Sequence, residues 1–220
     1  MTDTKKHPVA LPRYSLGEEL ISSISHGVGA ALAVAALVLC IVTGAMHRDP
    51  WAVVSGSVYG ATLIILYTMS TLYHAFPLGR AKRVFRVIDH CSVFLLIAGT
   101  YTPFTLVTLR GPVGWVLFGV VWGAAALGIV MSAIDLQRFR IASMVSYLAA
   151  GWVIIFAFRP LLQAMQTPGI VLLLTGGVAY TVGAGIYLVG KKVKYMHSLW
   201  HFFVLAGSIL HFFSILLYVL

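Results

Sequence analysis

The 220-residue sequence carries little charge: only 10% of its residues are Asp, Glu, Lys or Arg, compared with about 25% in ordinary soluble domains. So few charges exclude a surface that faces water on all sides. Asparagine is absent, so there is no N-glycosylation sequon. The two cysteines, Cys40 and Cys91, both lie inside apolar stretches without CxxC spacing, which argues against a disulfide framework.

Long apolar runs take up most of the chain, and 60% of its residues are hydrophobic. Crossing about 30 Å of hydrocarbon takes roughly 20 helical residues, and backbone groups in lipid must be satisfied within the segment itself. The sequence therefore predicts an all-α, polytopic membrane protein with seven transmembrane helices and no separate soluble domain. The predicted spans cover residues 20–45, 52–74, 85–108, 113–133, 141–158, 168–189 and 196–219.

The basic residues give these spans a direction. Twelve of the fifteen lysines and arginines fall on one side of the predicted membrane and three on the other. The positive-inside rule then predicts a cytoplasmic N-terminus and a C-terminus outside. The first side holds Lys5, Lys6, Arg13, Arg80, Lys82, Arg83, Arg86, Arg138, Arg140, Lys191, Lys192 and Lys194, and the second holds Arg48, Arg110 and Arg159.

The placement of charged and polar residues also indicates which partners and how many domains to expect. The net charge of +9 is split into short clusters between spans, which indicates topology signals and no nucleic-acid partner. Residues 1–17 are polar, with Pro8 and Pro12, and are expected to form a loose cytoplasmic tail. Residues 18–220 are expected to form one membrane domain.

Several polar side chains occur where apolar ones are expected. Ionisable groups inside a membrane span are costly and indicate function. Ser70 and His74 end the second span four residues apart, and Asp89 begins the third. His197 and His201 begin the seventh span, again four residues apart and so on one helix face. All of them fall at the predicted cytoplasmic ends of their helices.

This cluster predicts a zinc site. Two histidines one helical turn apart reach one ion, and His74 supplies a third nitrogen ligand, which leaves a fourth tetrahedral position open as in catalytic zinc sites. Asp89 would take a proton from water, and Ser70 would orient the water or a substrate oxygen. The alternative is that the histidines anchor helix ends at the membrane interface or bond to neighbouring carbonyls.

Other residues are given supporting or structural roles. Glu19, Ser23 and His26 share one stripe of the first span and are expected to surround the ligands. His211 lies ten residues beyond His201, about 15 Å along the helix, so it is expected to be a hydrogen-bonded packing residue. His90 is expected to point about 100° away from Asp89. Pro103 is expected to kink the third span.

The motifs resemble those of the hemolysin III family, part of the group that includes the progestin and adiponectin receptors. The resemblance runs from Glu18 to the C-terminus. Four stretches carry the motifs: Glu18-Glu-Leu-Ile-Ser-Ser-Ile-Ser-His-Gly27, Ser70-Thr-Leu-Tyr-His74, Asp89-His90 with Ala98-Gly-Thr-Tyr-Thr-Pro-Phe104, and His197-Ser-Leu-Trp-His201 with His211-Phe-Phe.

The resemblance implies a seven-helix fold in the bacterial inner (plasma) membrane, with Zn²⁺ near the cytoplasmic face. It implies that His74, His197 and His201 are the ligands and that Asp89 contacts the zinc-bound water. Because the wider superfamily includes alkaline ceramidases, it also implies hydrolysis of a membrane lipid amide or ester. The predicted depth of the site indicates that this lipid would enter from the inner leaflet.

Two other functions are weighed beside this hydrolase. A sensor or regulator of membrane lipid state would need the same site without significant turnover. A pore-forming cytolysin is disfavoured, because the chain has no soluble form and no helix with a continuous polar face. A substrate and an oligomeric state are not specified by the sequence.

Overall fold

A computed structural model describes residues 11–190 and 193–220 of the chain, which form helices and short connections without any strand. The helices are α1 (Leu16–Met46), α2 (Pro50–Ala75), α3 (Arg80–Pro103), the π-helical segment η1 (Phe104–Thr108), α4 (Pro112–Asp135), α5 (Arg140–Trp152), the 3₁₀ segment η2 (Val153–Ala157), α6 (Phe158–Ala164), α7 (Thr167–Val189) and α8 (Met196–Tyr218).

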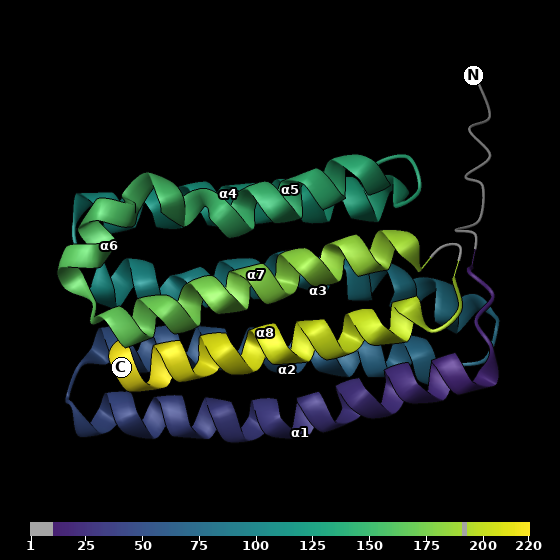
Figure 1. Cartoon of the computed structure of the whole chain (residues 1–220), viewed down its shortest axis with the longest axis horizontal. Helices are drawn as coiled ribbons and strands as arrows, with labels where there is room; N and C mark the ends of the chain where they lie inside the picture. The colour runs from purple at the N-terminus through teal and green to yellow at the C-terminus, as the bar shows by residue number, and fades with distance from the viewer. Residues whose placement is uncertain (1–10, 191–192) are drawn as a thin grey trace.

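Seven helical segments of the described chain are long and apolar enough to cross a membrane, so the predicted all-α, seven-span fold is confirmed. Two of the spans are composite, since η1 continues α3 and α5–η2–α6 form a single crossing. Figure 1 shows the helices side by side along one axis, with the start of α1 and the C-terminus at opposite ends. Large apolar side chains such as Leu32, Val38 and Leu127 are exposed on the outside, as a lipid-facing surface requires.

The ends of the bundle differ in charge. The starts of α1, α3, α5 and α8 and the C-terminal end of α2 lie at the same end, shown on the right in Figure 1. Of the arginines and lysines placed by sequence on the predicted cytoplasmic side, all that the structure describes belong to this end, hereafter the basic end. Which side of the membrane the basic end faces stays a prediction.

The fifth span breaks where the sequence predicts a continuous helix over 141–158. The Tyr101 hydroxyl of α3 donates a hydrogen bond to the Gly151 carbonyl (2.8 Å) and accepts one from the Ile154 N–H (3.0 Å). These bonds satisfy backbone groups at the junction of α5 with η2. Irregular backbone within a membrane is tolerated where protein groups satisfy it in this way.

The irregularity expected at Pro103 takes the form of the π-helical segment η1. The Thr105 hydroxyl lies 2.9 Å from the Tyr101 carbonyl and 3.1 Å from the Thr102 carbonyl. The Thr105 hydroxyl thereby donates to carbonyls in the last turn of α3, where the chain passes from α-helix into η1. Of the seven spans, α3 with η1 is the most buried, and it therefore forms the centre of the bundle.

Candidate metal centre

The first wall of the site is the start of α1, which is fixed by a capping box. The Ser15 hydroxyl accepts a hydrogen bond from the Glu18 N–H, and the Glu18 carboxylate accepts one from the Ser15 N–H at 2.9 Å. A second Glu18 oxygen accepts from the Tyr195 N–H, just before α8 (2.8 Å). These bonds hold the start of α1 against the start of α8 and set the register of Glu19 and His26.

The three candidate ligands come from two other helices. His74 lies in the last turn of α2, and His197 and His201 lie one turn apart at the start of α8. All three side chains are buried. The structure thus brings together residues that are 123 positions apart in the sequence.

The nitrogens face one another at a separation that suits a metal ion. The Nε2 atoms of His74 and His197 are 3.3 Å apart, as are those of His197 and His201. The three residues can present ligand atoms that all lie within 4.8 Å of one another. Two nitrogens bound to tetrahedral zinc at about 2.0–2.1 Å would be about 3.3 Å apart. The histidine triplet therefore fits a metal ion.

The partner of His74 supports this assignment. Its Nδ1 lies 2.7 Å from Glu19 Oε2, and a carboxylate only accepts, so Nδ1 carries the proton and donates. In neutral histidine the Nε2 lone pair is then directed at the other two rings. A histidine that donates its other ring N–H to a carboxylate is the usual arrangement of a metal ligand.

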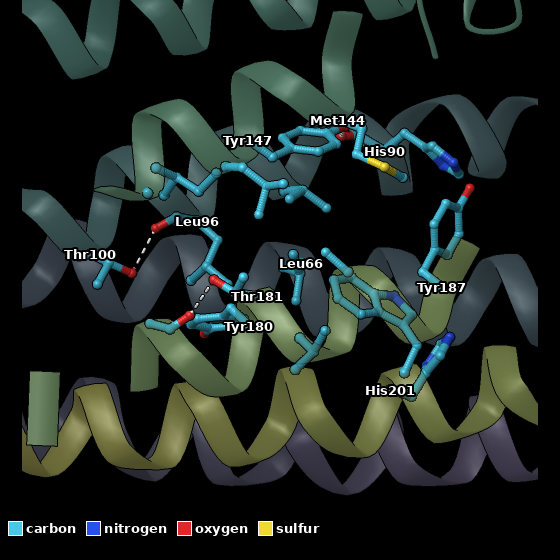
Figure 2. Close-up of a pocket in the computed structure, with 18 of the residues that line it drawn as sticks. Leu66, His90, Leu96, Thr100, Met144, Tyr147, Tyr180, Thr181, Tyr187 and His201 are labelled. Atoms are coloured by element: carbon cyan, nitrogen blue, oxygen red, sulfur yellow. Dashed lines mark hydrogen bonds between the residues drawn. The ribbon is translucent and has the colours of Figure 1, made fainter. Parts of the chain in front are cut away.

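A cavity of about 170 Å³ opens beside the histidines, between α2, α3, α5, α7 and α8, with His26 of α1 also in its lining. Asp89, Ser70, His197 and His201 all line it, so the predicted proton carrier and two of the predicted ligands face the same cavity. Figure 2 shows His201, Tyr187 and His90 toward one end and Thr100 toward the other, with mainly apolar side chains between them.

The length of the cavity follows from α8, which lines it from His197 to His211. Fourteen residues of helix span about 21 Å. His211 does not approach the ligands: its Nε2 lies 3.0 Å from the Leu173 carbonyl, to which it donates. This agrees with the predicted hydrogen-bonded packing role, although His211 also lines the far part of the cavity.

The remaining predicted residues separate into two groups. The His26 ring lies 3.9 Å from the His201 ring, centroid to centroid, and its Nε2 lies 3.4 Å from the His201 carbonyl, so it borders the ligands. Ser23 instead donates to the Thr71 carbonyl of α2 (3.3 Å). His90 also lines the cavity, and its Nδ1 lies 2.9 Å from the Arg86 carbonyl and 3.6 Å from Asp89 Oδ2.

The segment before α1 is not the loose tail expected from the sequence, as far as it is described. Residues 1–10 of that predicted tail lie outside the described residues. The Tyr14 ring stacks on the His197 ring at 4.6 Å with an interplanar angle of 14°, and its centroid is 5.8 Å from that of His74. Burial raises the pKa of the Tyr14 hydroxyl, as does nearby Tyr187, so it stays protonated at neutral pH.

Two residues of the site were missed in the sequence, Tyr14 and Lys82. Lys82 forms an ion pair with Glu19 (Nζ–Oε1, 2.7 Å) and is buried. Tyr14 lies in a polar, proline-containing segment, and Lys82 lies in a basic cluster that indicates topology. No signal in a single sequence separates either residue from its neighbours.

These observations define the class of protein: a multi-pass integral membrane protein with a buried three-histidine site that could hold a metal ion. A family model described as "Haemolysin-III related" matches residues 14–212. The chain belongs to the hemolysin III family, within the progestin and adiponectin receptor superfamily.

Individual relatives agree with this assignment. The chain is 43% identical to Hemolysin-3 of Bacillus cereus over 203 residues, 92% of each protein. It is 39% identical to the Hemolysin-3 homolog of Bacillus subtilis (strain 168) over 205 residues, 93% of this chain and 96% of the relative. It is 25% identical to the human Monocyte to macrophage differentiation factor over 183 residues, 77% of this chain and 74% of that protein. No solved structure gives a significant match.

Proposed function

We propose that this protein is a zinc-dependent hydrolase that cleaves an amide or ester bond of a membrane lipid. The observation that carries the proposal is the convergence of His74, His197 and His201 beside a cavity that is lined by His197, His201 and Asp89. A structural zinc site has no need of an adjoining cavity, whereas a catalytic site needs room for a substrate.

The metal assignment rests on the donor set. Imidazole nitrogens suit zinc, copper, iron and nickel, and three histidines with an open fourth position are typical of catalytic zinc. His74, His197 and His201 would hold the ion. When bound, zinc supplies a Lewis acid that polarises a carbonyl and makes water a stronger nucleophile at neutral pH.

Asp89 is proposed to move the proton. Its carboxylate would accept a proton from the attacking water and return it to the leaving nitrogen or oxygen, so that the amine or alcohol departs neutral. Ser70, buried in the same cavity wall, would donate a hydrogen bond that orients the substrate oxygen. The protein around them excludes bulk water from this step.

The cavity suggests the kind of substrate. Its lining between His201 and Thr100 is mainly apolar, from residues such as Leu66, Leu96 and Met144. An acyl chain could lie there with its carbonyl at the histidines. If the basic end faces the cytoplasm, the lipid would come from the inner leaflet; the bacterial Hemolysin-3 relatives support the plasma (inner) membrane as the location.

The test is hydrolysis by the purified full-length chain in lipid nanodiscs. Zinc-loaded protein is given a mixture of lipid amides and esters, and released fatty acids are measured by mass spectrometry. Asp89→Asn should keep its zinc and lose about 10²- to 10⁴-fold in rate, the usual contribution of a general base. Asp135→Asn, at the exposed C-terminal end of α4 and outside the cavity, is the matched control.

The regulator alternative predicts a different result. Zinc would bind, but the wild-type chain and Asp89→Asn would release fatty acid at the same background rate. That outcome would contradict the hydrolase proposal while leaving the metal centre intact.

A further inference from the structure

Lys82 is buried although its neighbours on both sides, Ala81 and Arg83, are exposed. Only 1% of the residue is exposed. Burying an ammonium group is costly unless the charge is paired and each N–H finds a partner. A lysine that served only as a topology signal could lie in the aqueous interface like Arg83, so its burial requires another explanation.

The ammonium group of Lys82 has two hydrogen-bond acceptors and an aromatic ring beside it. The Nζ atom is 2.7 Å from Glu19 Oε1 on α1 and donates to the Phe76 carbonyl at the end of α2 (3.1 Å). It also lies 5.1 Å from the centroid of the Tyr73 ring, a cation–π distance. One side chain of α3 thereby holds the ends of α1 and α2 together.

The contact with Glu19 continues directly to a candidate ligand. One Glu19 oxygen binds Lys82, and the other accepts from His74 Nδ1 at 2.7 Å. Both Tyr73 and Phe76, the other two partners of Lys82, lie within two residues of His74. Lys82 therefore contacts the backbone and side chains that decide where His74 lies and how its ring is turned.

We propose that Lys82 and Glu19 are positioning residues of the metal centre, which hold His74 with its Nε2 directed at His197 and His201. Lys82 fixes the Glu19 carboxylate, and Glu19 fixes the tautomer and the rotation of the His74 ring. This inference rests on the proposed metal binding, and it extends the centre to a residue that contacts no metal.

The geometry makes Glu19→Gln a sharp test. A glutamine has one acceptor oxygen where glutamate has two. If that oxygen faces Lys82, the amide NH₂ faces His74 Nδ1 and favours the tautomer with hydrogen on Nε2, which cannot bind metal. If it faces His74, the NH₂ opposes the Lys82 ammonium. Either orientation disrupts the contacts that join Lys82, residue 19 and His74, although the side chain at position 19 keeps its size.

The experiment measures Zn²⁺ affinity by chelator competition on purified full-length protein in nanodiscs. Glu19→Gln and Lys82→Met should each bind Zn²⁺ about 10- to 100-fold more weakly than wild type, the usual effect of losing a partner of a ligand. Lys82→Arg keeps a charged donor and should recover most of the loss. Asp49→Asn is the matched control, since Asp49 is ion-paired with Arg110 at the opposite end of the bundle and should leave the affinity within about threefold.

Cobalt(II) distinguishes positioning from general destabilisation. At saturating Co²⁺, Glu19→Gln should shift the visible absorption bands of the bound ion, because the orientation of His74 changes. A role confined to stability would lower the melting temperature of the metal-free protein and leave the Co²⁺ bands unchanged, which would overturn the proposal. So would wild-type Zn²⁺ affinity in both Glu19→Gln and Lys82→Met.

Failure of the metal centre itself would look different. In that case the wild-type chain would bind neither Zn²⁺ nor Co²⁺, and the proposed function would fall together with this inference. Normal metal binding by wild type and by both variants would remove only the positioning role of Lys82 and Glu19.

Discussion

The Nε2 atoms of His74 and His197 lie 3.3 Å apart, although the residues belong to the end of one helix and the start of another that is 123 residues away. When neither Nε2 atom carries a hydrogen, the two lone pairs face each other and repel. A cation between them converts the contact into a stabilising one. The Nε2 atoms of His197 and His201 are separated by the same distance.

Zinc should stabilise the folded protein through these contacts. A ligand that binds only the folded state at one hundred times its Kd adds about 2.7 kcal/mol to the free energy of unfolding. We expect zinc to raise the melting temperature of the chelator-treated chain, and His201→Ala to abolish this rise. Equal zinc-dependent shifts in wild type and His201→Ala would contradict the assignment of His201 as a ligand.

Tyr14 should slow the loss of metal. Its ring stacks on His197 and lies near His74, covering two ligands at the basic end. Tyr14→Ala should accelerate zinc transfer to a soluble chelator by about tenfold or more, while Arg13→Ala, an exposed neighbour, should not. Stopped-flow measurement with a fluorescent chelator gives the rates, and identical rates in all three proteins would exclude a covering role.

Gly114 should be required for the packing of α4 against η1. A Cβ built at this position would lie 2.1 Å from the Thr105 carbonyl oxygen and 2.3 Å from that of Leu109, so the backbone itself must shift. Gly114→Ala should lower the free energy of unfolding by about 1–3 kcal/mol. Gly119→Ala, where a Cβ meets open space, should be neutral or slightly stabilising. Unfolding in detergent compares the two variants. Equal free energies of unfolding would contradict the prediction, because they would show that the backbone of η1 shifts at little cost.

The orientation of the bundle should follow its charge. In a Cys40→Ala/Cys91→Ala background, Gln137→Cys places a thiol at the basic end and Gln166→Cys places one at the opposite end; both positions are exposed. In intact cells, a membrane-impermeant maleimide should label position 166 and leave 137 unlabelled until the cells are opened. The reverse pattern would overturn the predicted cytoplasmic N-terminus.

The sequence was sufficient to predict the spans and the histidine cluster for physical reasons. Seven apolar runs leave few alternatives to seven helices, because the bilayer fixes their length. The i, i+4 spacing of His197 and His201 makes them neighbours in any helix, and placing α2 and α8 by charge puts His74 at the same depth. Periodicity and depth together therefore predicted which side chains could meet.

The parts that were missed depend on packing between distant segments. The break at η2 arises because Tyr101, fifty residues from Gly151 in the sequence, offers a hydroxyl to its carbonyl. Local propensity in an apolar run carries no trace of such a bond. Likewise, nothing in the basic cluster distinguishes the buried Lys82 from the exposed Arg83 until α1 supplies Glu19. Tertiary contacts decide these features.

The central claim is that the three histidines bind one zinc ion, and metal analysis of the purified chain tests it most directly. Inductively coupled plasma mass spectrometry should find about one zinc per wild-type chain. His74→Ala, His197→Ala and His201→Ala should each contain far less, with His211→Ala as the buried-histidine control that keeps its metal. A wild-type chain without zinc that takes none up from buffer, or full zinc in all three ligand variants, would contradict the account.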